Sequence, residues 1–112
     1  MKLNHLNLTV NDVKAASEFL EKYFELQIRN TRGNSFAVLF DDSGLVFTLM
    51  KGDQVSYPNT FHIGFIQESE DRVNEINQRL KDDGFKVEPP QRSHAWTFYV
   101  KAPGGFTVEV LS

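Results

Sequence analysis

The chain has 112 residues, of which 40% are hydrophobic, and a formal net charge of −3 at pH 7. This length supplies one ordinary globular core, and the acidic balance leaves no basic footprint for nucleic acid. The sequence contains no cysteine, which excludes disulfides, thiolate metal ligands and a cysteine nucleophile. We expect a cytoplasmic protein without a signal peptide or a membrane span, because the amino terminus runs directly into a predicted strand and no apolar run is long.

The first half of the chain predicts a strand, a helix and three further strands. The opening strand covers residues 4–10 and carries His5 at its second position. A helix is predicted over residues 13–24, because apolar residues recur there at helical spacing and Asp12 is a good amino-terminal cap. The strand-like runs that follow cover residues 26–31, 36–41 and 45–51.

The second half repeats this order after a polar linker at residues 52–60. Its strand at residues 61–67 carries His62 at the second position, and apolar residues then recur at helical spacing up to Gly84, a predicted carboxy-terminal cap. The strand-like runs that follow cover residues 85–89, 96–101 and 106–111, with a loop predicted at 89–94.

The repeat defines the fold class as α+β, with two tandem βαβββ modules. Module one covers residues 1–51 and module two covers residues 61–112, and together they form a single domain of residues 1–112. Each module is too short to bury a comfortable core alone. The two are therefore expected to share one sheet system or to pair with another chain.

Three polar residues lie at repeat-related places on otherwise apolar strands. His5 and His62 are equivalent, while Glu109 on the last strand corresponds to Thr48 in the first module. A carboxylate in an apolar strand is costly to bury unless it is paired or bound to a metal. Each residue alone is more often an ordinary strand residue, but two histidines and one carboxylate suit a divalent metal with open coordination positions. The coincidence favours a metal site.

Three stretches, residues 3–10, 61–63 and 98–110, resemble the vicinal oxygen chelate superfamily of glyoxalases, bleomycin-resistance proteins, extradiol dioxygenases and fosfomycin-resistance transferases. The resemblance implies cupped mixed β-sheets around a central cavity. It also implies one divalent ion, either zinc, nickel, manganese or iron, held by His5, His62 and Glu109. Thr48 stands where glyoxalases usually carry a fourth ligand, which disfavours a glyoxalase proper. The family commonly pairs its modules about a two-fold axis, so a homodimer is expected.

Further polar and aromatic residues are candidates for the rest of the site. His94 is the candidate catalytic residue, because an imidazole can move a proton, although an ordinary solvated loop also explains it. The substrate-pocket candidates are Asn7, Thr9, Thr48, Tyr57, Arg92, Trp96 and Tyr99.

These features predict a metal-dependent enzyme that chelates a small molecule through vicinal oxygens, as a lyase or a thiol transferase does. One alternative is a metal-free protein of the bleomycin-resistance type that sequesters a ligand. The others are an extradiol-type dioxygenase and an inactive subunit that keeps the fold.

Overall fold

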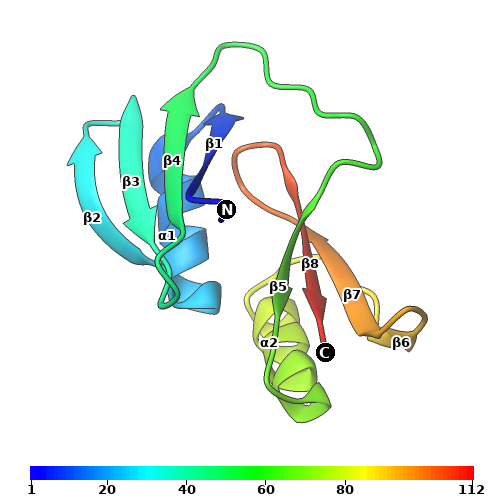
Figure 1. The fold of residues 1–112 in the computed structure, drawn as a ribbon. Coiled ribbons are helices and arrows are strands. Elements are labelled where there is room, and N and C mark those ends of the chain that lie inside the picture. Colours follow the sequence, from blue (N-terminus) through cyan, green and yellow to red (C-terminus); the bar gives the residue numbers. More distant parts are fainter. The chain divides into compact units, whose positions relative to one another are not determined.

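The computed structural model describes residues 1–112 and divides them into two compact units. Unit 1 contains residues 1–57 and 103–105, and unit 2 contains residues 58–102 and 106–112. Each unit has one helix and one four-stranded mixed sheet (Figure 1). The predicted α+β fold of two βαβββ modules is confirmed.

Unit 1 follows the predicted order of elements. They are β1 (His5–Val10), α1 (Val13–Phe24), β2 (Gln27–Arg32), β3 (Phe36–Phe40) and β4 (Val46–Lys51). The sheet order is β1-β4-β3-β2, and β1 runs parallel to β4. Asp12 caps α1 by accepting a hydrogen bond from the backbone N–H of Ala15 at 3.0 Å. Leu8 and Val10 of β1 are buried while His5 lies on the exposed face, as strand alternation predicts.

Tyr57 covers part of the free edge of β1. Its hydroxyl accepts a hydrogen bond from the backbone N–H of Thr9 at 2.9 Å and donates one to the Thr9 carbonyl at 2.9 Å. A side chain thereby satisfies both backbone groups that a neighbouring strand would otherwise pair.

Unit 2 repeats the arrangement of unit 1. Its elements are β5 (Ile63–Ile66), α2 (Glu70–Asp82), β6 (Gln91–Arg92), β7 (Trp96–Lys101) and β8 (Thr107–Leu111). The sheet order is β5-β8-β7-β6, and β5 runs parallel to β8. Val108 and Val110 of β8 are fully buried, as are Val73 and Leu80 of α2. Glu109, the residue between the two valines on β8, therefore points to the face that does not carry the core.

The strand predicted at residues 85–89 is wrong. The structure has no strand there, and β6 is a two-residue strand within the predicted loop. Pro89 and Pro90 have no N–H to donate to a ladder. The carbonyl of Glu88 accepts a hydrogen bond from the Asn77 side chain of α2 at 2.9 Å, which ties this segment to the helix rather than to β7.

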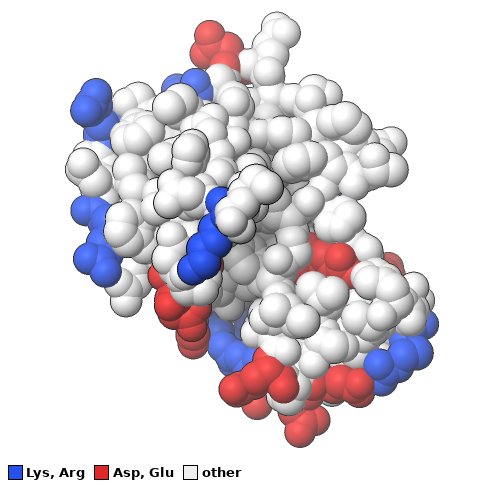
Figure 2. All heavy atoms as spheres, viewed as in Figure 1, with Lys and Arg blue, Asp and Glu red and all other residues white.

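The surface carries both signs of charge. On the face shown in Figure 2, Lys and Arg side chains are interspersed with Asp and Glu and form no continuous basic patch.

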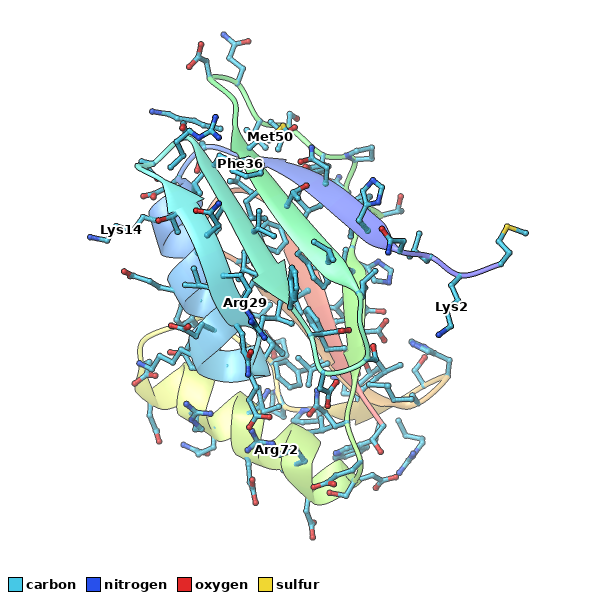
Figure 3. The ribbon with its side chains drawn as sticks, turned by 60° about the vertical axis from the view of Figure 1, so that its left-hand side comes forward. Lys2, Lys14, Arg29, Phe36, Met50 and Arg72 are labelled. Carbon is cyan, nitrogen blue, oxygen red and sulfur yellow. The ribbon has the colours of Figure 1, made fainter.

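Figure 3 shows Phe36 and Met50, which are register partners, near one end of β3 and β4. Neither α1 nor α2 has the length and apolar character that a bilayer-spanning helix needs.

Candidate metal centre

Glu109 is the central side chain of the candidate site. It lies on β8, an inner strand, opposite Gly64 of β5 on one side and Tyr99 of β7 on the other. The residue is 5% exposed although it faces away from the valine core. A buried carboxylate requires strong partners, and the structure supplies them.

One oxygen of Glu109 accepts two short hydrogen bonds. Thr97 Oγ1 donates to Oε2 at 2.6 Å, and His94 Nε2 donates to the same oxygen at 2.6 Å. Burial by itself raises the pKa of Glu109, but the bonds from Thr97 and His94, the charge of His94 and a hydrogen bond from Tyr99 outweigh it. The pKa of Glu109 is therefore lowered, and the side chain is an anion at neutral pH.

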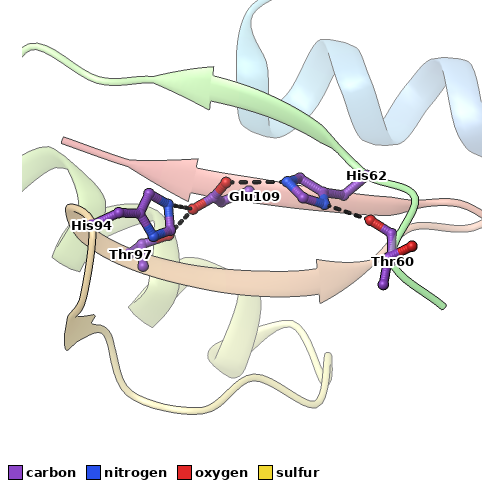
Figure 4. A network of polar contacts seen from close by, with 5 residues as sticks. All are labelled: Thr60, His62, His94, Thr97 and Glu109. Atoms are coloured by element: carbon purple, nitrogen blue, oxygen red, sulfur yellow. Dashed lines mark hydrogen bonds and ion pairs between the residues drawn. The ribbon is translucent and has the colours of Figure 1, made fainter.

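The Nε2 atom of His62 faces the other oxygen of Glu109. When the imidazole is neutral, this nitrogen carries no proton. Its Nδ1 lies 3.0 Å from the carbonyl oxygen of Thr60 and must donate there, because a carbonyl only accepts. The neutral imidazole then has a lone pair on Nε2, which lies 3.4 Å from Glu109 Oε1 (Figure 4). Two acceptors that face each other repel unless a proton or a metal cation lies between them.

In unit 1, the Nδ1 atom of His5 is also hydrogen-bonded to an oxygen, as that of His62 is in unit 2. Its Nδ1 donates to Asn4 Oδ1 at 3.1 Å, which leaves Nε2 free. The structure thus brings His62 and Glu109 together in unit 2, while His5 belongs to unit 1. Neither unit by itself contains a group of three His, Asp or Glu side chains arranged to hold a metal ion.

The remaining candidate residues are tied to partners within their own units. In unit 1, Thr48 donates to Asn7 Oδ1 at 2.7 Å across β4 and β1, and Tyr57 is bonded to Thr9 as described above. In unit 2, Arg92 pairs with Glu70 of α2 at 2.6 Å and Trp96 donates to Asn74 of α2 at 2.8 Å. These last two contacts attach β6 and the start of β7 to α2.

Two hollows in unit 2 give access to the residues around Glu109. The larger, of about 1060 Å³, is lined by His62, Tyr99 and Lys101 among others. The smaller, of about 390 Å³, is lined by His94, Thr97 and Tyr99 among others. Tyr99 is 45% exposed and lines both hollows. Burial, the charge of Glu109 and a bond to Glu109 raise the pKa of the Tyr99 phenol, which therefore keeps its proton.

Sequence reasoning missed two residues of this network, Thr97 and Thr60. The short turn between β7 and β8 pairs Lys101 with Thr107 and Tyr99 with Glu109. Counting back from that turn puts Thr97 on the same face as Tyr99, beside the glutamate. The signal for Thr97 was therefore present. The Thr60 contact is made by a backbone carbonyl, which no side-chain pattern reveals.

In unit 2 the ligand atoms of two predicted ligands, His62 and Glu109, lie at a spacing that is compatible with one divalent ion. The 3.4 Å between His62 Nε2 and Glu109 Oε1 is short enough for both atoms to reach one ion at bond lengths of about 2.0–2.2 Å. Ligand histidines usually donate their other ring N–H to a carbonyl or carboxylate, as His62 does to Thr60. The carboxylate is ionised, as a ligand must be.

The fold defines a protein of the tandem βαβββ type, with two mixed sheets and a buried carboxylate on the last strand. The chain belongs to the Glyoxalase/Bleomycin resistance protein/Dioxygenase superfamily, whose family model matches residues 2–110. The predicted family is therefore confirmed.

Three known proteins are similar to this chain. A solved structure of "a possible Glyoxalase from Bacillus cereus" is 64% identical with a TM-score of 0.97, over 100% of this chain and 99% of that chain. A variant of the fosfomycin resistance protein FosX from Listeria monocytogenes, solved with Mn(II) and 1S,2S-dihydroxypropylphosphonic acid, shares the fold. Its TM-score is 0.82 at 23% identity, over 98% of this chain and 88% of that chain.

The third relative is a curated Bacillus subtilis (strain 168) protein, "Probable trivalent organoarsenical cleaving enzyme". It is 29% identical over 85 residues, which are 76% of this chain and 58% of that protein. The match thus spans little more than half of the curated relative.

Proposed function

We propose that this protein is a divalent-metal-dependent enzyme that chelates a small substrate through two neighbouring oxygens, in a lyase-like or thiol-transferase-like reaction. The proposed ligands are His5, His62 and Glu109, and the ion is zinc, nickel, manganese or iron. The observation that carries the proposal is the 3.4 Å between His62 Nε2 and Oε1 of Glu109, two atoms that repel each other when the imidazole is neutral. A metal cation turns that repulsion into attraction to both atoms.

The protein side of the reaction follows from the contacts in unit 2. When bound, the ion would act as a Lewis acid that stabilises negative charge on substrate oxygens. His62 and Glu109 would hold it, and burial of Glu109 lowers the local dielectric and strengthens its attraction for a cation. His62 and Tyr99 line the larger hollow, so a substrate there would reach the same place.

The relatives support this class of reaction without defining the substrate. FosX is named for fosfomycin resistance and was solved with Mn(II), and the curated Bacillus protein is named for cleavage of organoarsenicals. The chain has no cysteine, so any thiol in the reaction must be a co-substrate. We place a lyase or transferase first, a dioxygenase second and a metal-free binder third.

The decisive experiment is calorimetric titration of the purified protein with zinc, nickel, manganese and ferrous iron. The wild type should bind one ion per chain, and Glu109→Gln should lose most of the affinity, because the amide carries no charge. Glu88→Gln is the matched control, since Glu88 is an exposed carboxylate that lines the same larger hollow. Absence of binding by the wild type, or equal binding by Glu109→Gln, would disprove the site.

The reaction class is then tested on metal-loaded protein. The assays would offer methylglyoxal–thiol adducts, fosfomycin with thiols, and catechols. Turnover of one of the first two is expected. Oxygen uptake with a catechol would favour the dioxygenase instead. Tight binding of an aromatic drug by protein free of metal would favour a ligand-sequestering protein.

We further propose that the protein is a homodimer. Each sheet leaves large apolar side chains exposed, with Met50 at 47% in unit 1 and Ile66 at 79% in unit 2. A symmetric dimer, the commonest form of soluble oligomer, would take such side chains out of water. Light scattering at micromolar concentration should give the mass of a dimer, and a monomer throughout that range would contradict the proposal.

A further inference from the structure

We infer that Thr97 and His94 are positioning residues that clamp Oε2 of Glu109, so that the carboxylate binds the metal through Oε1 alone. The inference rests on the proposed metal-dependent function. It goes further by assigning different roles to the two oxygens of one ligand and by adding two residues outside the proposed ligand set.

The hydrogen bonds distinguish the two oxygens. Oε2 accepts from Thr97 Oγ1 at 2.6 Å and from His94 Nε2 at 2.6 Å. A carboxylate oxygen offers about two lone-pair directions, so these two donors occupy Oε2. The hydrogen bond from Tyr99 to this carboxylate is a third contact, additional to the clamp. Oε1 is the oxygen that faces His62 Nε2, on the opposite side of the carboxylate from His94 (Figure 4).

The clamp is built from a part of unit 2 that is held in place by other contacts. Thr97 is 6% exposed on β7, where its branched Cβ limits rotation about χ1. His94 lies in the turn between β6 and β7, which is closed by a bond from Ser93 N–H to the Ala95 carbonyl at 2.9 Å. The bonds of Arg92 and Trp96 to α2, described above, anchor both sides of this turn.

The consequence concerns coordination. A carboxylate that binds through one oxygen leaves one more position open for substrate oxygens than a carboxylate that binds through both. The clamp also prevents Glu109 from rotating away from the ion. Hydrogen-bond partners of metal ligands commonly set metal affinity in this way, and their loss costs about 10–100-fold.

The test compares substitutions that remove each donor with substitutions that keep it. Thr97→Val removes the hydroxyl at nearly constant shape, and Thr97→Ser keeps it. His94→Leu removes the ring donor, and His94→Gln returns an N–H at a similar distance. Thr107→Val is the matched control, because Thr107 lies on β8 with Glu109 but forms no bond to it.

We expect Thr97→Val and His94→Leu each to weaken zinc binding by about 10–100-fold, while the serine, glutamine and Thr107 variants stay near wild type. The visible spectrum of bound Co²⁺, which reports coordination number, should change when both donors are removed together. A purely structural role would lower the thermal midpoint of metal-free protein without this selective change in affinity and spectrum.

Two results would overturn the inference, and they are distinguishable. If Glu109→Gln abolishes binding but Thr97→Val and His94→Leu bind zinc as the wild type does, the clamp is wrong and the metal site stands. If the wild type binds no metal, both the clamp and the proposed function are wrong. Should Thr97→Val fail to fold, the contrast between His94→Leu and His94→Gln decides.

Discussion

The turn that leads into β8 is held by a close backbone approach at Gly104. This residue has φ +102°, a conformation that side-chain-bearing residues rarely adopt. A Cβ added there would lie 3.0 Å from Val10 Cβ and 3.2 Å from Ala16 Cβ. Both neighbours are 0% exposed, so neither has room to move aside. The Gly104 carbonyl also accepts the Asn11 N–H at 3.1 Å, which fixes the turn on β1 and α1.

Gly104→Ala should therefore be strongly destabilising. Left-handed strain costs about 1–2 kcal/mol for a residue with a Cβ, and forcing a methyl group into a packed core costs about 1–3 kcal/mol. The expected loss in the free energy of unfolding is thus about 2–5 kcal/mol. Gly44→Ala separates the two terms, because Gly44 has φ +96° and no atom within 4 Å of an added Cβ. The control should lose only the strain, about 1–2 kcal/mol.

The measurement is urea denaturation followed by far-ultraviolet circular dichroism, which reports on the helices and sheets of both units. The difference between the two variants isolates the steric term, since the change in the unfolded chain is the same for both. If Gly104→Ala loses no more stability than Gly44→Ala, the packing of this turn against Val10 and Ala16 is wrong.

Three smaller predictions follow from single contacts. The Asp41 carboxylate accepts hydrogen bonds from the N–H groups of Ser43 and Leu45 at 2.9 and 2.8 Å. Burial raises the pKa of Asp41, but these hydrogen bonds outweigh burial and lower the pKa below its ordinary value of 3.8. Asp41→Asn should cost about 1 kcal/mol at neutral pH, and this difference should shrink as the pH of a denaturation series falls below 3.8. Tyr57→Phe should lower stability by about 1 kcal/mol in the same assay, because Thr9 loses both partners at the strand edge, and no change would refute that role. The metal affinity of the wild type should fall in mild acid, because the proposed ligands bind as two neutral imidazoles and a carboxylate. Calorimetric titration at several pH values measures this, and an affinity that does not change with pH would contradict the prediction.

Much of the site was predictable because it depends on strand periodicity. Alternation alone puts His5 opposite the buried Leu8 and Val10, and puts Glu109 opposite Val108 and Val110. The repeat then identifies His5 and His62 as equivalent positions. Such inferences need only local sequence and a two-residue period, which the structure follows closely.

The rest depended on contacts that no local pattern specifies. The segment at residues 85–89 has the composition of a strand, but two prolines and the bond from Asn77 to Glu88 keep it off the sheet. The contact between His94 and Glu109 joins residues that are 15 apart, through a turn whose position depends on α2. The sequence singled out His94 for proton transfer, but its bond to the buried carboxylate was visible only in the structure.

The two histidines share a feature that links the proposed metal site to assembly. In each unit an oxygen just before the histidine in sequence, Asn4 Oδ1 or the Thr60 carbonyl, holds Nδ1 and leaves Nε2 free. Each ligand is thus oriented within its own unit. Because the proposed set takes His5 from unit 1 and the other ligands from unit 2, only a pair of units can complete it, from one chain or from two. If two chains supply the pair, metal and dimer must stabilise each other. Light scattering of protein diluted until the dimer begins to dissociate should then show more dimer with zinc than with a chelator, whereas an equal fraction of dimer in both would contradict a metal site shared between two chains.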